Sequence, residues 1–166
     1  MVSPRYRRGD IVLLSRIFLE RSGPQRPLPD VAAWSEKAAA IARELEPRGV
    51  RVVVFGPLPM FRFESVQSCM RSFLASVCGA SRAGLAAAID PVVEDIQAAE
   101  QGRTKILLFR PFEHLCPETE TVCLPFLGGR MVFRDKDHLN IVGAAGLAGA
   151  FMERLEITRR TIYPER

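Results

Sequence analysis

The chain has only two histidines, and one of them stands in a loop rich in acidic residues. His138 follows Asp135 by three residues, and the small-residue segment that begins at Ile141 predicts a helix directly after it. A carboxylate at this spacing can accept a hydrogen bond from one imidazole nitrogen, which fixes the tautomer and leaves the other nitrogen free to take a proton from a nucleophile. Asp135 and His138 are therefore the candidate orienter and general base of a nucleophilic reaction. No equally clear nucleophile precedes them in the sequence.

Other uses of this loop compete with catalysis. It can be a hydrogen-bonded surface turn that caps the following helix, with Asn140 as the N-cap residue. A divalent cation held by Asp135, Asp137 and His138 is a second alternative, but three ligands from one short loop make a poor cage, so we expect no metal. Asp137 also competes as the orienter, although an acid adjacent to the histidine meets the ring less readily than one a turn away.

Composition excludes several classes of protein. The 166 residues, 48% of them hydrophobic, are enough to bury one core, and we expect a single domain over residues 1–166. Lysine and arginine are interleaved with acids and the net charge is only +4, which argues against a nucleic-acid partner. No run of about 18 apolar residues is present, so the chain itself does not span a membrane. The basic amino terminus is not followed by an apolar segment of signal-peptide length.

The four cysteines fall as two local pairs, Cys69 with Cys78 and Cys116 with Cys123. Three pairings are possible and sequence alone does not choose among them, but local closure is favoured because short loops cost little entropy to close. The intervals lack the close two-residue spacing of structural zinc sites. We therefore expect disulfides rather than free thiols or zinc, which implies an oxidising compartment.

Short apolar runs alternate with helical patterns along the chain. Strands are predicted at residues 11–14, 50–55, 105–109 and 130–133. Helices are predicted between Asp30, as N-cap, and Pro47, at residues 81–89, from Asp90-Pro91 to about residue 101, and at residues 141–156. Strands separated by helices predict a parallel sheet covered on both faces, a three-layer α/β/α fold. In such sheets the site lies outside the carboxyl ends of the strands.

The residues that follow two of these strands are the candidate substrate-binding and oxyanion-binding residues. Ser15 and Arg16 follow the first strand, and Gly56 and Pro57 follow the second. Ser15 competes as the nucleophile, but a rim residue is the better interpretation. Arg16 either binds the acyl oxygen or a substrate anion, or is a solvated charge. Gly56 and Pro57 are expected to shape the rim through their backbone angles rather than to react. We expect these segments, and the segment after Phe109, to share one rim with the loop from Asp135 to His138.

Four blocks occur in an order that resembles a known family. They are Ile11–Arg16, Val52–Pro59, Leu107–Pro117 with Cys123, and Asp135–Leu139 followed by Gly143-Ala144. Ile11–Arg16 resembles a strand with an arginine just past its end, and Val52–Pro59 resembles a strand with a proline-rich rim loop. Leu107–Pro117 with Cys123 resembles a strand and a late disulfide loop, and Asp135–Leu139 resembles a terminal acid–histidine block. Together they resemble the SGNH (GDSL-like) hydrolase superfamily. The likeness is strongest to the periplasmic SGNH domain fused to membrane acyltransferases that O-acetylate surface polysaccharides.

This resemblance implies a flavodoxin-like fold and a Ser-His-Asp triad with His138 as base and Asp135 as orienter. The implied reaction moves or hydrolyses an acyl ester, such as an acetyl ester, on a cell-surface polysaccharide, with no cofactor and no metal. It also implies a membrane acyltransferase domain as partner, upstream or in trans, and a periplasmic or other extracytoplasmic location as part of a membrane-anchored protein.

The chain departs from the family at the nucleophile. The family carries a Gly-Asp-Ser block after its first strand, whereas the only Gly-Asp here, Gly9-Asp10, is followed by Ile11. Ser15-Arg16 also stands where the family has an oxyanion-hole asparagine. We therefore interpret the chain as the carboxyl-terminal portion of an SGNH-type domain, without its first strand and its serine. The alternative is a non-catalytic periplasmic remnant or a carbohydrate-binding module with the same fold.

Overall fold

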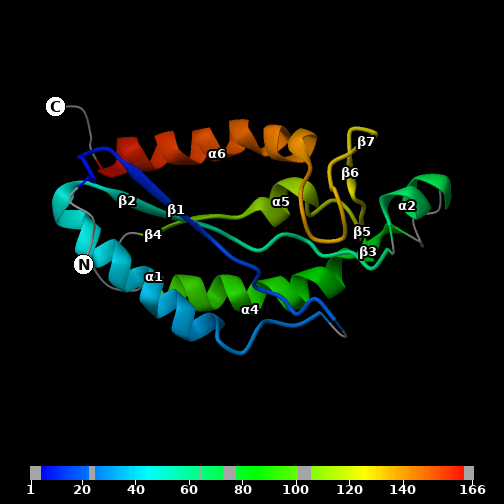
Figure 1. The fold of residues 1–166 in the computed structure, drawn as a ribbon, viewed down its shortest axis with the longest axis horizontal. Helices are drawn as coiled ribbons and strands as arrows, with labels where there is room; N and C mark the ends of the chain where they lie inside the picture. The colour runs from blue at the N-terminus through cyan, green and yellow to red at the C-terminus, as the bar shows by residue number, and fades with distance from the viewer. Residues whose placement is uncertain (1–4, 23–24, 64, 73–77, 101–105, 163–166) are drawn as a thin grey trace.

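The centre of the fold is a parallel three-stranded sheet in the order β1-β2-β4 (Figure 1). The computed structural model describes residues 5–22, 25–63, 65–72, 78–100 and 106–162. The strands are β1 (Ile11–Ser15), β2 (Arg51–Phe55) and β4 (Ile106–Phe109). Leu13 lies opposite Val53, and Val53 lies opposite Leu107. The predicted parallel sheet is confirmed.

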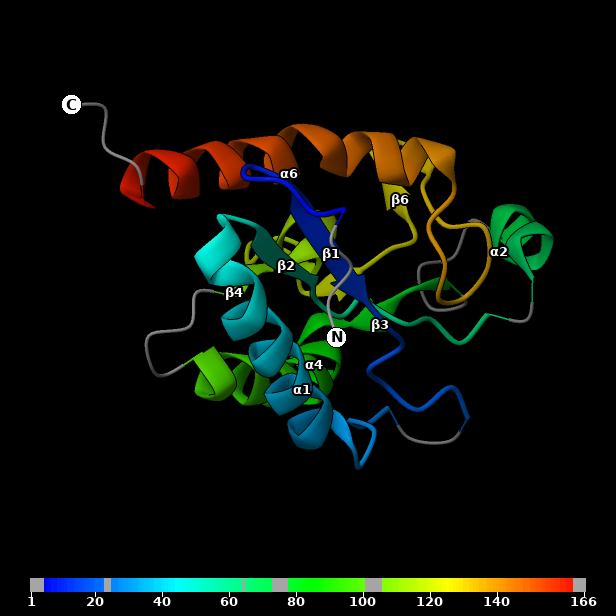
Figure 2. The ribbon, with the colours of Figure 1, turned by 60° about the vertical axis from the view of Figure 1, so that its left-hand side comes forward.

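Helices cover both faces of this sheet, which confirms the predicted three-layer α/β/α fold (Figures 1 and 2). On one face lie α1 (Val31–Leu45) and α4 (Arg82–Glu100), and on the other lie α5 (Pro111–Leu115) and α6 (Ile141–Ile162). After α1 the short 3-10 helix η1 (Glu46–Arg48) ends at Gly49, whose φ of +71° favours glycine. Among the described helices, none combines the length and apolarity that a bilayer crossing needs.

The smaller elements lie beyond the carboxyl ends of the strands. They are α2 (Val66–Ser72), the antiparallel pair β3 (Ala80–Ser81) and β5 (Val122–Cys123), and the hairpin of β6 (Phe126–Leu127) and β7 (Arg130–Met131). Disulfides join Cys69 to Cys78 and Cys116 to Cys123, and all four cysteines are buried. The predicted local pairing is confirmed.

Two predictions of helix ends were wrong. The segments predicted as two helices on either side of Asp90 form the single helix α4, with Pro91 inside it. Proline costs a helix one backbone hydrogen bond, but the buried positions Leu85, Val92 and Ile96 keep helical spacing across it, so packing holds the two halves in line. Asp30 makes no side-chain cap bond to α1, because its carboxylate binds Arg16 instead.

Candidate active site

The acid–histidine loop is a closed turn between β7 and α6. The N–H of Arg134 donates to the carbonyl of His138 at 2.8 Å, which closes the turn. The rim loop after β2 holds it from one side: the N–H of Phe61 donates to the carbonyl of Lys136 at 2.8 Å, and the Phe61 ring meets the Phe133 ring edge-on at 5.0 Å. The turn is therefore fixed by the sheet's carboxyl rim as well as by its own backbone.

Asn140 fixes the exit from this turn into α6. Its Oδ1 accepts the N–H of Gly143 at 2.9 Å, so Asn140 is the N-cap that the sequence predicted. Its Nδ2 donates to the carbonyl of Met131 and its backbone N–H to the carbonyl of Val132, at 2.8 and 3.0 Å. A Cβ on Gly143 would lie 2.2 Å from the Val132 oxygen. Glycine is thus needed for α6 to begin this close to the β7 segment.

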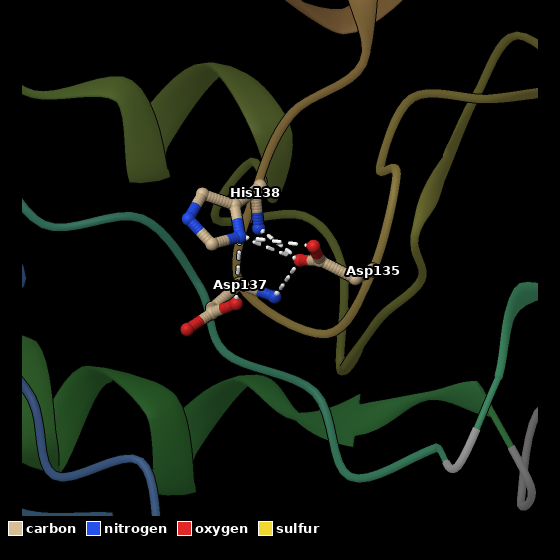
Figure 3. A group of neighbouring side chains, drawn as sticks. All are labelled: Asp135, Asp137 and His138. Atoms are coloured by element: carbon tan, nitrogen blue, oxygen red, sulfur yellow. Dashed lines mark hydrogen bonds and ion pairs between the residues drawn. The ribbon is translucent and has the colours of Figure 1, made fainter.

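Two carboxylates gather around one nitrogen of His138 (Figure 3). Nδ1 lies 2.9 Å from both Oδ1 and Oδ2 of Asp135, as the spacing predicted. Oδ1 of Asp137 lies 3.0 Å from the same nitrogen, so the expectation that an adjacent acid meets the ring less readily was wrong. Because the turn is tight, the carboxylates of Asp135 and Asp137 both lie on the Nδ1 side of the His138 ring. In Figure 3 the other ring nitrogen, Nε2, points away from both acids.

The electrostatics of the turn keep Asp135 ionised. Burial raises the pKa of Asp135, but the backbone N–H of Asp137, the imidazole and the backbone N–H of His138 together outweigh it and hold that pKa well below its usual range. The two backbone donors lie 3.1 and 2.8 Å from Oδ1. An anionic acceptor at Nδ1 favours the tautomer that carries its proton there. Nε2 then has the free lone pair that a general base needs.

Nε2 faces an arginine that the sequence analysis did not single out. Nη2 of Arg21 lies 3.4 Å from Nε2 of His138, and Nε of Arg21 lies 2.5 Å from Oδ2 of Asp137. Lys136 donates from Nζ to the Arg21 carbonyl at 3.0 Å. In the described part of the chain, no serine or threonine hydroxyl is hydrogen-bonded to Nε2. Only the fold brings the loop after β1 to this turn, so no local sequence signal could have found Arg21.

A hollow of about 80 Å³ joins the candidate rim residues to the turn. Its lining includes Ser15, Arg16, Gly56 and Pro57, together with Asp137. The rims after β1 and β2 therefore meet the turn, as predicted. The segment after β4 does not line this hollow: it lines a second one of about 400 Å³, beside α6.

A comparison with known protein families decides which family this is. The family described as "SGNH domain (fused to AT3 domains)" matches residues 4–153. The chain belongs to this family. An SGNH domain of this kind is a hydrolase- or acyltransferase-type domain. The fusion to AT3 domains in the family's description indicates a membrane acyltransferase domain as partner. Domains of this family are typically extracytoplasmic. Among curated proteins and among solved structures, no match to the chain was found.

The rim residues of this SGNH domain have clear structural tasks. The Arg16 guanidinium makes two hydrogen bonds to Asp30, at 3.1 and 2.9 Å, and lies 5.8 Å from the centre of the Trp34 ring. It therefore ties the loop after β1 to α1 and is not a free charge. The Gly56 N–H donates to the Phe109 carbonyl at 2.9 Å, and a Cβ on Gly56 would lie 2.9 Å from that oxygen. Gly56 thus keeps the ends of β2 and β4 in contact.

The same turn also groups potential metal ligands. One ligand atom each from Asp135, Asp137 and His138 lie within 4.8 Å of one another, and no other such group occurs among the described residues. All three residues come from one turn, and the carboxylates of Asp135 and Asp137 already contact Nδ1 of His138.

Proposed function

We propose that this SGNH domain moves or hydrolyses an acyl ester, with acetyl as the acyl group, on a cell-surface polysaccharide. His138 is the general base and Asp135 its orienter, in a single domain that forms the carboxyl-terminal portion of the full SGNH fold. The observation that carries the proposal is the placement of Nδ1, 2.9 Å from both oxygens of Asp135, in a chain of this family.

The proposed reaction is acyl transfer through a covalent ester. A serine hydroxyl, supplied from outside this chain, attacks the acyl carbonyl while its proton passes to Nε2 of His138. Ionised Asp135 stabilises the imidazolium, which then gives the proton to the leaving alcohol as the acyl–oxygen bond breaks. A sugar hydroxyl or water next attacks the acyl-serine, gives its proton to Nε2, and the serine takes that proton back. Neither a metal nor a cofactor is needed, but Arg21 has to leave Nε2.

The membrane acyltransferase domain is the proposed source of the acyl group, and the acceptor is a surface polysaccharide. The two disulfides support an oxidising, extracytoplasmic location for this chain.

The test replaces each of the two histidines in the cell that makes the protein. His138→Gln should abolish the ester-linked acetate of the surface polysaccharide, measured as acetate released by mild base. His114→Gln is the matched control, because the His114 ring stacks on Phe109 in the second hollow. With both variants at wild-type protein level, unchanged acetate in His138→Gln, or equal loss in both, contradicts the proposal.

One observation favours a second candidate, a non-catalytic remnant or carbohydrate-binding module. Nε2 of His138 faces the Arg21 guanidinium rather than a hydroxyl. Unchanged acetate in His138→Gln cells is the result that this candidate predicts.

A further inference from the structure

Arg21 is tied to its neighbours less fully than Arg16, which lies in the same loop after β1. Arg16 uses all three of its nitrogens: Nε donates to a backbone carbonyl, and both terminal nitrogens donate to Asp30. Arg21 binds a carboxylate only through Nε, which contacts Asp137, while its Nη2 lies 3.4 Å from Nε2 of His138. Within the residues that the structure describes, no acceptor is hydrogen-bonded to Nη1 of Arg21. The outer edge of this guanidinium is therefore open to a ligand.

Lys136 is a second cation at the same place, and it has no acidic partner among the described residues. Its Nζ donates to the backbone carbonyl of Arg21 at 3.0 Å. An ammonium group has three N–H donors, so two remain without a partner in that part of the chain. The backbone of Lys136 is held in place as well, because its carbonyl accepts the N–H of Phe61 at 2.8 Å. The Arg21 guanidinium and the Lys136 ammonium, the cation pair, therefore both keep donors for a ligand.

The charges around the turn do not balance. The turn and the loop arginine beside it carry three positive side chains and two negative ones, which are Arg21, Arg134, Lys136, Asp135 and Asp137. With His138 neutral, their sum is +1. The guanidinium beside Nε2 also opposes the imidazolium that the proposed reaction forms, because like charges this close repel each other. An anion bound to the cation pair would offset both the excess charge and this repulsion.

Asp137 fixes where the cation pair stands relative to the hollow at the rim. Its side chain is only 6% exposed, and its Oδ2 accepts a hydrogen bond from Nε of Arg21. The same residue lines the hollow together with Ser15 and Gly56. The cation pair therefore borders the hollow on one side and Nε2 of His138 on the other. A ligand held by the pair has one part at the base and another within reach of the rim.

We propose that the cation pair is an anion subsite beside the general base, and that it takes the carboxylate of an acidic sugar in the acceptor polysaccharide. This inference rests on the proposed function, which it makes more specific. Carboxylates match the planar donor fork of a guanidinium. A carboxylate also carries a single negative charge, which equals the excess of +1, whereas a phosphate monoester carries about 1.5 to 2 negative charges.

The subsite positions the acceptor and uncovers the base at the same time. A sugar acid carries its carboxylate and its hydroxyl groups on the same ring. Because Nη2 of Arg21 lies 3.4 Å from Nε2 of His138, a carboxylate held by Arg21 brings a hydroxyl of the same ring next to Nε2. The bound carboxylate also attracts the guanidinium away from Nε2, which the proposed reaction requires. A neutral sugar does neither, so the subsite selects acidic acceptors.

The experiment titrates the whole protein with two probes, an oligogalacturonate and a neutral galactose oligosaccharide of the same length, and follows the His138 imidazole by NMR. The oligogalacturonate should bind about tenfold or more tightly than the neutral probe. Lys136→Gln should weaken that binding by about the same factor, and Arg21→Lys, which keeps the charge but loses the fork, should weaken it too. Arg134→Gln is the matched control. It removes the same charge from the same turn, but Arg134 lies beside Asp135, on the Nδ1 side of the ring, so it should change the affinity by at most about twofold.

Several results overturn the proposal. These are equal affinity for the acidic and the neutral probe, equal weakening by Lys136→Gln and Arg134→Gln, or tighter binding of inorganic phosphate than of the oligogalacturonate in the same titration. The acetate assay of His138→Gln cells separates this proposal from the proposed function. Selective binding of the acidic probe with unchanged acetate supports the anion subsite and counts against the proposed function. Lost acetate without any preference for the acidic probe supports the proposed function and overturns the anion subsite.

Discussion

Gly143→Ala should destabilise the protein, although alanine is the better helix former. In a helix interior this exchange gains about 1 kcal/mol. At Gly143, however, the new Cβ would lie 2.2 Å from the Val132 oxygen and 3.0 Å from a Leu139 methyl carbon. A carbon–oxygen contact needs about 3.3 Å, so α6 has to move roughly 1 Å from the β7 segment. That movement strains the Asn140 bonds to Met131 and Val132, each worth about 1 kcal/mol, and adds an overpacking cost of about 1–3 kcal/mol.

These contributions predict a net loss of about 2–3 kcal/mol in the free energy of unfolding of Gly143→Ala. Urea denaturation measures it. Gly149→Ala in the same helix is the control, because nothing beyond its chain neighbours and the nearby backbone of α6 lies within 4 Å of its added Cβ. This control should gain up to about 1 kcal/mol. If Gly143→Ala is as stable as Gly149→Ala, the close approach of α6 to Val132 is not real and the reasoning fails.

Three further predictions concern the turn and its surroundings. Because the pKa of Asp135 is lower in the folded protein than its unfolded value of about 4, its ionisation stabilises the fold above about pH 4, and this stabilisation is lost as the pH falls toward the folded pKa. Urea titrations from pH 6 to 2 should therefore show that the free energy of unfolding declines less steeply in Asp135→Asn than in the wild type. An unchanged slope would contradict the direction of the pKa shift. Arg21→Ala should speed carbethoxylation of His138 by diethyl pyrocarbonate, followed by mass spectrometry, and leave the other histidine unchanged; equal rates in wild type and variant would show that Arg21 does not cover Nε2. Replacing Cys116 and Cys123 together by alanine should lower the unfolding free energy by about 2–3 kcal/mol in urea, and a variant as stable as the wild type would rule the bridge out as a stabilising element.

The sequence was most informative where local pattern and burial agree. The apolar runs that became β2 and β4 could be recognised because strands that are covered on both faces are apolar throughout. The acid–histidine pair could be recognised because three residues of separation already bring both groups into one turn. The Asn140 cap was predictable for the same reason, since a cap bond spans only three residues.

Prediction failed where a distant partner decides the outcome. Asp30 is a good cap residue by type, but Arg16 takes its carboxylate. Pro91 is a good helix start by type, but the buried stripe of α4 continues through it. Arg21 reaches His138 only because parallel pairing puts the loop after β1 on the same rim as the turn. Contacts of this kind depend on tertiary packing that no local window contains.

We propose that Asp135 holds the proton of His138 on Nδ1 and leaves Nε2 as the base. Nitrogen NMR of the neutral imidazole tests this proposal, and His114→Gln assigns the signals because the chain has only two histidines. We expect a protonated Nδ1 and an unprotonated Nε2 in the wild type, and a loss of this preference in Asp135→Asn. A proton on Nε2 in the wild type, or a preference that Asp137→Asn removes and Asp135→Asn does not, would contradict it.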